Sequence, residues 1–348
     1  MHKLKRILRL LFPLAGIASA ILFVPWTWVW LWITPLPDTV QEQVNQAIQH
    51  DLDGIIVYIQ QGEKPGLSYT AGWKNRDSLI AASPENLFKI ASISKLYIAS
   101  AAVKLMVRGD LDADKPLSFY LPELGNRIAN AEDITLRMLI QHRSGIPNFT
   151  DQSDYPWDHP PKTNRETLEY VLDLPADFAP DSDYAYSNTN YLLLGEIMDT
   201  VLGHSHHQFI SEEILKPLGL KNTYSLLANA PFHEVMSGYF MGYPYDIKGN
   251  DFINPGGSMV ATASDVGKFL RALNVGTLLS KTEQELYTSL YPLGHTGLVP
   301  GYESFAFYYS DLDAVVVQFV NTGGGISWSI SELIYNRIVK ILRNNTSA

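Results

Sequence analysis

Strand-like segments stand near the two ends of the chain, and this placement constrains the fold more than any other feature of the sequence. Residues 54–60 and 66–73 are strand-like and flank a Gly- and Pro-containing turn, which is typical of two paired strands. Near the other end, residues 303–310 and 314–321 form a similar pair, and residues 329–343 carry a helical pattern. The sequence therefore predicts one antiparallel sheet that is assembled from both ends of the chain.

Helical patterns dominate the region between these strands. They cover residues 92–108, 136–142, 189–202 and 265–273. We therefore expect an α/β (α+β) fold, in which an antiparallel sheet is flanked by helices and interrupted by a mostly helical subdomain. The sheet part is expected at about residues 40–80 and 285–348, and the helical part at about residues 81–284.

The first 37 residues differ from the rest of the chain. Residues 10–36 contain no ionisable side chain, and at 1.5 Å per residue such a run is long enough to cross ~30 Å of hydrocarbon. Basic residues and no acid precede it. We expect residues 1–37 to form a cytoplasmic stub and a transmembrane helix, or uncleaved signal, and residues 38–348 to form a periplasmic or extracellular domain of a single-pass membrane protein. The alternative is a signal peptide cleaved at the A-x-A pattern of residues 18–20.

Composition excludes several kinds of chemistry. The chain has no cysteine, which rules out a disulfide scaffold, a thiolate zinc site, an iron–sulfur cluster and a cysteine nucleophile. Four of the 26 basic residues lie within the first nine positions, so the other 22 stand against 36 acidic residues, and this argues against a nucleic-acid partner. The sequence also lacks a G-x-S-x-G elbow, a phosphate-binding GxxxxGK[ST] loop, an H-E-x-x-H helix and a GxGxxG turn.

The only S-x-x-K pattern is Ser92-Ile93-Ser94-Lys95, at the start of a nearly all-apolar helix. A helix that is apolar all round is buried. Residues three apart share a helix face, so the Lys95 amine can reach the Ser92 hydroxyl. Burial lowers the pKa of a lysine and lets its amine accept the hydroxyl proton. Ser92 and Lys95 are therefore a candidate nucleophile and base; the alternative is a helix-capping serine followed by a surface lysine.

A second candidate is Tyr186-Ser187-Asn188, just before a predicted helix. Alternate residues of an extended segment point the same way, so Tyr186 and Asn188 can line one cleft. A phenolate beside a cation can act as a general base, and an Asn amide can donate to a carbonyl and accept from a lysine. Tyrosine and asparagine are also frequent in ordinary loops, which is the alternative explanation.

A third candidate is the segment of residues 295–298, which follows a turn and reads as an edge strand. His295 and Thr296 offer side-chain donors, and Gly297 lets a substrate approach the backbone. The backbone N–H of Leu298 can complete an oxyanion hole with that of Ser92.

Together the three motifs resemble those of the serine β-lactamase and penicillin-binding-protein superfamily, on the branch of class C β-lactamases, D-alanyl-D-alanine carboxypeptidases and related esterases. Further stretches similar to that family are residues 88–91, 134–147, 186–195, 217–220 and 256–265. The resemblance covers roughly residues 40–340 and implies a β-lactamase/transpeptidase-like fold.

The resemblance also implies a role for each candidate residue. Ser92 would be the acylated nucleophile, and Lys95 and Tyr186 would share the proton transfers. Asn188 would position the substrate amide, and the strand at residues 295–298 would bind the acyl side. Water activated by Tyr186 would then release the product from the acyl-enzyme.

Two residues depart from the family pattern. His295 stands where class C β-lactamases carry lysine, and Leu298 stands where carboxylate-binding members offer a hydroxyl. We therefore expect a D-alanyl-D-alanine carboxypeptidase-like hydrolase or an esterase, acting on a peptidoglycan-type peptide or a small ester or amide, more than a β-lactamase. A penicillin sensor without turnover and an inactive scaffold are the alternatives from other classes. The resemblance implies no cofactor and no metal, and the histidines of residues 203–207 match no closed tetrahedral site.

Overall fold

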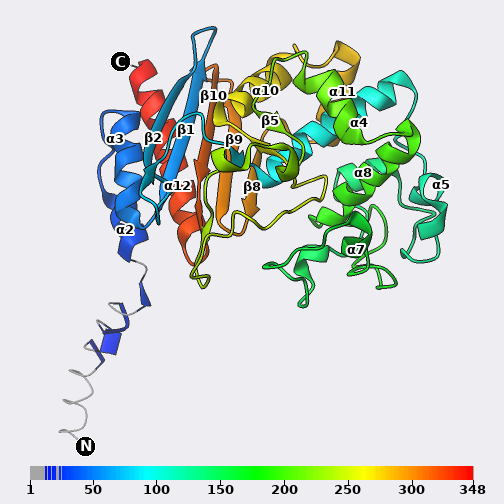
Figure 1. Ribbon diagram of the computed structural model, residues 1–348, viewed down its shortest axis with the longest axis horizontal. Coiled ribbons are helices and arrows are strands. Elements are labelled where there is room, and N and C mark those ends of the chain that lie inside the picture. The colour runs from blue at the N-terminus through cyan, green and yellow to red at the C-terminus, as the bar shows by residue number, and fades with distance from the viewer. Residues whose placement is uncertain (1–11, 14, 17, 21–22, 25, 348) are drawn as a thin grey trace, which may run out of the picture.

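The computed structural model describes residues 12–13, 15–16, 18–20, 23–24 and 26–347 (Figure 1). In this part of the chain the helices are α2 (Trp26–Ile33), α3 (Val40–Ala47), α4 (Ser94–Arg108), α5 (Leu117–Tyr120), α6 (Leu136–Ile140), α7 (Asn164–Leu168), α8 (Asn188–Leu202), α9 (His206–Ile210), α10 (Ala263–Val275), α11 (Lys281–Leu290) and α12 (Ser327–Ser347). The strands are β1 (Gly54–Gln61), β2 (Leu67–Asn75), β3 (Ile80–Ala81), β4 (Phe88–Lys89), β5 (Thr223–Tyr224), β6 (Tyr239–Phe240), β7 (Val260–Ala261), β8 (His295–Val299), β9 (Tyr302–Tyr309), β10 (Ala314–Val320) and β11 (Thr322–Gly323). A short 3₁₀ turn, η2 (Ala91–Ile93), leads directly into α4.

A six-stranded antiparallel sheet in the order β3-β2-β1-β10-β9-β8 is built from both ends of the chain (Figure 1). Its central strands β1 and β10 pair from Ile55↔Val320 to Gln61↔Ala314. β-Branched residues dominate both strands, which suits a pleated surface that is covered on both faces. The predicted α/β class with one sheet from both ends is confirmed, and the four predicted strands differ from the observed ones by one or two residues at their ends.

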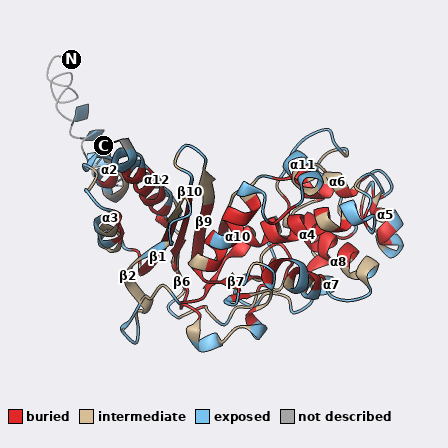
Figure 2. Cartoon of the chain, turned by 90° about the horizontal axis from the view of Figure 1, so that it is seen from above, coloured by how far each residue is buried: buried red, intermediate tan, exposed pale blue. Residues whose placement is uncertain are grey.

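Helices cover both faces of this sheet. α3 and α12 pack with one apolar cluster on one face, and α10 and α4 belong to the larger cluster on the other. Figure 2 shows the buried residues gathered in the sheet, α10 and α4. Every residue of α4 from Ser94 to Val103 is buried, as its apolar sequence predicts, and the helix ends at Gly109 with a left-handed φ of 88°. The S-x-x-K motif therefore opens a helix through the centre of the molecule.

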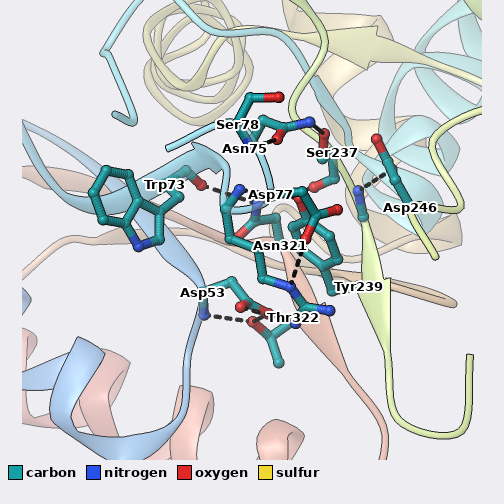
Figure 3. A network of polar contacts seen from close by, with 12 residues as sticks. Asp53, Trp73, Asn75, Asp77, Ser78, Ser237, Tyr239, Asp246, Asn321 and Thr322 are labelled. Carbon is teal, nitrogen blue, oxygen red and sulfur yellow. Dashed lines mark hydrogen bonds and ion pairs between the residues drawn. The ribbon is translucent and has the colours of Figure 1, made fainter. Parts of the chain in front are cut away.

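A polar network fastens the segment around β6 to the sheet (Figure 3). Asn321 Nδ2 donates hydrogen bonds to the carbonyl oxygens of Trp73 at 3.1 Å and Ser237 at 2.9 Å. Thr322 Oγ1 donates to Asp53 Oδ2 at 3.0 Å and accepts from the Asp53 backbone N–H at 2.7 Å. β6 and β11 then pair in parallel. The network fixes the chain after Ser237, and this part of the chain contributes Phe240 and Tyr243 to the wall of a cavity described below.

The described residues of the N-terminal apolar run do not form the transmembrane helix that the length of the run predicts. Among the residues that the structure describes, no helix is both long and apolar enough to cross a bilayer. α2 has eight residues, roughly 12 Å of helix against ~30 Å of hydrocarbon. The prediction of a membrane anchor at residues 10–36, and with it of a single-pass membrane protein, is therefore wrong. Residues 1–11, 14, 17, 21–22 and 25 lie outside the described part of the chain.

The end of that run packs on the domain instead. Leu31 is 1% exposed, in the apolar cluster that includes α3 and α12. Arg337 of α12 donates from Nη1 to the carbonyl oxygens of Leu31 at 3.0 Å and Thr34 at 2.7 Å. It also donates from Nη2 to Pro35 O at 2.9 Å and from Nε to Gln43 Oε1 at 2.6 Å. The hydropathy of a run reflects its composition and does not reveal contacts such as those of Leu31 and Arg337. For this reason the length of the apolar run led to a wrong prediction. The domain boundary proposed from the sequence stays a prediction.

Candidate active site

Ser92 lies in η2, at the amino end of α4. Ala91 before it has a φ of 49°, in the left-handed region that favours glycine. Two hydrogen bonds hold the backbone of Ile90, the residue before Ala91. The Ile90 N–H donates to Met259 O at 3.0 Å, and Ser304 Oγ donates to Ile90 O at 3.1 Å. The turn therefore places the Ser92 hydroxyl where the helix dipole stabilises developing negative charge.

Lys95 lies one helical turn further along and is completely buried. Its Nζ donates to Ser92 Oγ at 3.2 Å, to Asn188 Oδ1 at 2.7 Å and to Gly256 O at 2.8 Å. A Cβ at Gly256 would lie 3.0 Å from Nζ and 2.7 Å from the Tyr191 Cβ, so glycine is what lets this carbonyl approach. Burial lowers the pKa of Lys95 to about 7. Because its three partners are neutral oxygens, the amine can accept a proton near neutral pH.

Tyr186 reaches the same serine from the segment before α8. Its hydroxyl donates to Ser92 Oγ at 2.8 Å. Burial raises the pKa of Tyr186, and the contact with Ser92 opposes this effect. The phenol is therefore neutral at pH 7 and acts as a donor in the resting site. The structure thus brings Ser92, Lys95 and Tyr186, taken from two separate motifs, into one hydrogen-bonded cluster.

Asn188 is the first residue of α8 and presents its Oδ1 to the Lys95 amine. Its Nδ2 donates to Thr150 Oγ1 at 3.1 Å, and its backbone N–H donates to Asn148 Oδ1 at 3.0 Å. These two contacts orient the amide. The sequence motifs did not identify Asn148 or Thr150; the available signal was their position directly after the similar stretch of residues 134–147.

His142 was also missed as a site residue, and it packs against Tyr186. The two ring centroids are 4.5 Å apart. His142 Nδ1 accepts a hydrogen bond from the Ser187 backbone N–H at 3.2 Å, which places the proton of the neutral ring on Nε2. Burial lowers the pKa of His142 to about 3, so the ring stays neutral at pH 7. It therefore packs against the Tyr186 ring without adding a charge to the site.

The edge strand β8 lies directly beside η2. A Cβ at Gly297 would lie 2.3 Å from Ile90 O, so only glycine allows this approach. The His295 ring lies 6.1 Å from the Tyr186 ring, centroid to centroid. Burial, and after it the charge of Lys95, lowers the pKa of His295 to about 4. His295 is therefore neutral at pH 7 and supplies no positive charge to a substrate.

The candidate side chains meet in a cavity of about 800 Å³. Its lining includes Ser92, Tyr186, Asn188, His295, Thr296 and Leu298, the aromatic residues Trp157, Phe240, Tyr243 and Trp328, and the acid Glu303. The Leu298 side chain is 52% exposed and gives this wall an apolar surface. Among the described residues that line the cavity, none is lysine or arginine. The cavity therefore suits a substrate with apolar groups beside the bond that reacts.

The histidines that the sequence places at residues 203–207 do not form a metal centre in the described structure. His206 Nδ1 lies 2.7 Å from Asp199 Oδ1, an ordinary His–Asp pair. In the described part of the chain, no group of three or more His, Cys, Asp or Glu side chains is arranged to hold a metal ion.

Comparison with known proteins gives similarities over most of the chain. Residues 36–327 match the family described as Beta-lactamase. The chain is 31% identical to protein flp of Staphylococcus aureus over 194 residues, which are 54% of this chain and 39% of that protein. It is 24% identical to penicillin-binding protein 4* of Bacillus subtilis over 257 residues, which are 68% of this chain and 55% of that protein. The chain thus spans about half or less of the length of these curated relatives.

Among solved structures, the D-amino acid amidase of Ochrobactrum anthropi SV3 has a similar fold. The two structures superpose with a TM-score of 0.78 at 22% sequence identity, over 88% of this chain and 98% of that one.

Proposed function

The chain belongs to the Beta-lactamase family and is a serine hydrolase of that fold, and from this premise we propose that it cleaves small amides or esters through an acyl-enzyme on Ser92. One observation carries the proposal. Ser92 Oγ receives hydrogen bonds from both Lys95 Nζ and Tyr186 OH, and it lines an open cavity. A serine between a base and a second proton carrier is the arrangement that nucleophilic catalysis needs.

Acylation starts with a proton transfer. Neutral Lys95 accepts the Ser92 proton as Oγ attacks the substrate carbonyl carbon. The backbone N–H groups of Ser92 and Leu298 stabilise the oxyanion. The Lys95 proton then passes through the Tyr186 hydroxyl to the leaving nitrogen or oxygen as the scissile bond breaks. An ester on Ser92 and a neutral Lys95 remain.

Deacylation reverses the proton path. A water molecule attacks the ester carbonyl, and its proton passes to Lys95 through the Tyr186 hydroxyl. As the ester bond breaks, this proton returns to Ser92 Oγ and the acid product leaves. Burial raises the pKa of Tyr186, so we assign the base to Lys95 and the relay to Tyr186. Asn188, held by Thr150 and Lys95, orients the substrate amide or ester.

The charge of the cavity favours small amides and esters over substrates with a free carboxylate. His295 is neutral at pH 7, Leu298 offers no hydroxyl, and no lysine or arginine lines the cavity among the described residues. The second candidate is a carboxypeptidase acting on a peptidoglycan-type peptide. Its support is the similarity to penicillin-binding protein 4*.

A Ser92→Ala substitution tests the proposal. We expect the wild-type protein to turn over a neutral 4-nitrophenyl ester and to show an acyl adduct by intact-protein mass spectrometry, and Ser92→Ala to lose both, with the rate falling by at least about a thousandfold. Ser100→Ala is the matched control, because Ser100 lies on α4, the helix that directly follows Ser92, and its hydroxyl donates to Leu96 O.

Each outcome of this experiment has a distinct meaning. An adduct that turns over supports the hydrolase. Stable adducts with both a fluorescent penicillin and the ester, neither of which turns over, indicate a sensor. A wild-type protein that forms no adduct with either reagent refutes the acyl-enzyme and leaves the inactive scaffold.

A further inference from the structure

Glu303 is a buried carboxyl group in the wall of the cavity that holds Ser92. It lies on β9 opposite Leu298 of β8, with 0% of its surface exposed. Ser327 Oγ donates to its Oε1 and Ser331 Oγ to its Oε2, both at 2.6 Å. Burial raises the pKa of Glu303 to about 7, and the two serine hydroxyls counter this effect. The carboxyl is therefore largely ionised above neutral pH.

No described cation balances this carboxylate. Its neighbour in register on β10 is Val320, its partners on α12 are serines, and no lysine or arginine lines the cavity among the described residues. Arg337, further along α12, donates its hydrogen bonds to the carbonyl oxygens of Leu31 and Thr34 instead. His295 is neutral at pH 7. A buried charge normally has a partner of opposite sign, so a bound molecule is the available source of one.

Ser327 connects this charge to the cavity. Its hydroxyl proton is directed at Glu303 Oε1, so the remaining lone pairs of Oγ are acceptors. Ser327 itself lines the cavity. A donor inside the cavity can therefore bind Ser327 Oγ while the carboxylate behind it increases the negative potential.

Aromatic rings in the cavity wall also favour a positively charged group. Trp328 follows Ser327 and stacks on Phe305, with ring centroids 4.8 Å apart. Phe240 and Tyr243 line the same cavity. The faces of aromatic rings attract cations. The dipole at the amino end of α12 would by itself favour an anion. The Glu303 carboxylate already takes that place, because it accepts hydrogen bonds from Ser327 and Ser331 of this helix.

We infer that the end of the cavity at the start of α12 is a subsite for a cationic amino or ammonium group of the substrate. The inference rests on the proposed function and narrows it to small amides or esters that carry an amine away from the scissile bond. The ammonium group donates to Ser327 Oγ, and its charge is stabilised by Glu303 and the aromatic faces. A carboxylate at the same place in the substrate is repelled.

Two matched substrate series test the charge preference. On the acyl side, the 4-nitrophenyl esters of 6-aminohexanoic, heptanoic and pimelic acid present an ammonium, a methyl and a carboxylate at the same distance. On the leaving-group side, 2-(dimethylamino)ethyl acetate, whose protonated amine keeps one N–H, is compared with 3-methylbutyl acetate. We expect the cationic member of one series to exceed its neutral counterpart in kcat/KM by about ten- to a hundredfold. Equal rates in both series, or a preference for the carboxylate, would overturn the inference.

Variants assign the preference to this subsite. Glu303→Gln should reduce the ratio of cationic to neutral kcat/KM to near one, and Ser327→Ala should lower it while leaving the acid in place. Glu332→Gln removes the same charge from the exposed surface of α12 and should keep the wild-type ratio. A Glu303→Gln protein that folds and keeps the full preference contradicts the assignment; if it does not fold, Ser327→Ala decides.

The failure of this inference is distinguishable from that of the proposed function. Turnover of the heptanoate ester that depends on Ser92, without a cation preference, refutes only the subsite. If no ester is turned over, calorimetric titration of the Ser92→Ala protein with hexylammonium chloride decides the subsite separately. Binding that Glu303→Gln abolishes supports the subsite, and absent or unchanged binding refutes it.

Discussion

At the scale of single residues, Lys95 is the group whose surroundings decide the chemistry. It sits fully buried among neutral oxygens from Ser92, Asn188 and Gly256. A lysine beside a carboxylate would remain charged and could not take a proton. Here burial without an acid lowers the pKa to about 7, which matches a general base to neutral solution.

This surrounding predicts a pH dependence. In the mechanism that we propose, Lys95 acts as the base only when its amine is neutral, so kcat/KM for a neutral ester should rise with pH through about 7 and level off above it. Steady-state rates between pH 5 and 9 check this expectation, and Lys95→Met should lose about 10²- to 10⁴-fold in kcat. His142 and His295, whose pKa values burial lowers to about 3 and about 4, are already neutral over that range.

Glu303, whose pKa burial raises to about 7, lines the same cavity and also titrates in this window. The acid limb should persist in Glu303→Gln when the substrate is neutral. A rate that does not change between pH 5 and 9, or a limb that disappears with Glu303→Gln, would assign the base elsewhere.

At the scale of elements, the site depends on how closely β8 approaches η2. The strand is an edge strand, yet its partner on the open side is the turn that carries Ser92. Gly297 makes the contact possible, since a Cβ there would lie 2.3 Å from both Ile90 O and Ser304 Oγ. The same strand carries Leu298, whose backbone N–H stabilises the oxyanion in the mechanism that we propose.

Gly297→Ala should therefore impair catalysis more than folding. Moving β8 away from η2 displaces one oxyanion donor, and we expect kcat/KM for a neutral ester to fall about 10²- to 10³-fold. The free energy of unfolding should fall by about 1–3 kcal/mol from overpacking. Gly249→Ala is the control, because a Cβ at Gly249 would meet no atom within 4 Å. Full activity in Gly297→Ala would show that the close approach is not needed.

At the scale of the whole molecule, α12 joins the two ends of the chain. Its Arg337 donates to neutral oxygens of Leu31, Thr34, Pro35 and Gln43, far away in sequence. Burial lowers the pKa of Arg337, and the planar guanidinium meets these acceptors in a fixed fork. Residues 31–43 are thereby held against the face of the sheet that lies away from α4.

Arg337→Leu should loosen this attachment. It leaves buried carbonyl oxygens without donors, and we expect the free energy of unfolding to fall by about 3 kcal/mol in denaturant titrations. Lys340→Ala, an exposed change on the same helix, should have little effect. If the two variants are equally stable, the contacts of Arg337 do not hold the segment.

The sequence could predict what depends on local pattern. Alternating and β-branched runs located β1, β2, β9 and β10, and the spacing of Ser92 and Lys95 placed them on one helix face. The contacts of Asn148, His142 and Glu303 arise from tertiary packing. The family-like stretch of residues 134–147 contains His142 and ends next to Asn148, but it does not reveal what these two side chains contact, and no short motif marks Glu303. The transmembrane helix was wrong for a related reason: apolar composition does not reveal that Leu31 packs on the domain and that Arg337 binds the carbonyl oxygens beside it.

The length of α12 offers a practical handle. Its first residue is in the cavity wall, and 21 residues of helix, roughly 30 Å, separate that end from the other (Figure 1). Asn345 near the far end is exposed, and the chain contains no cysteine. A single Asn345→Cys substitution would therefore create a unique labelling position. A fluorophore or a surface coupling there leaves the mouth of the cavity free, so single molecules can be immobilised and watched while they turn over substrate.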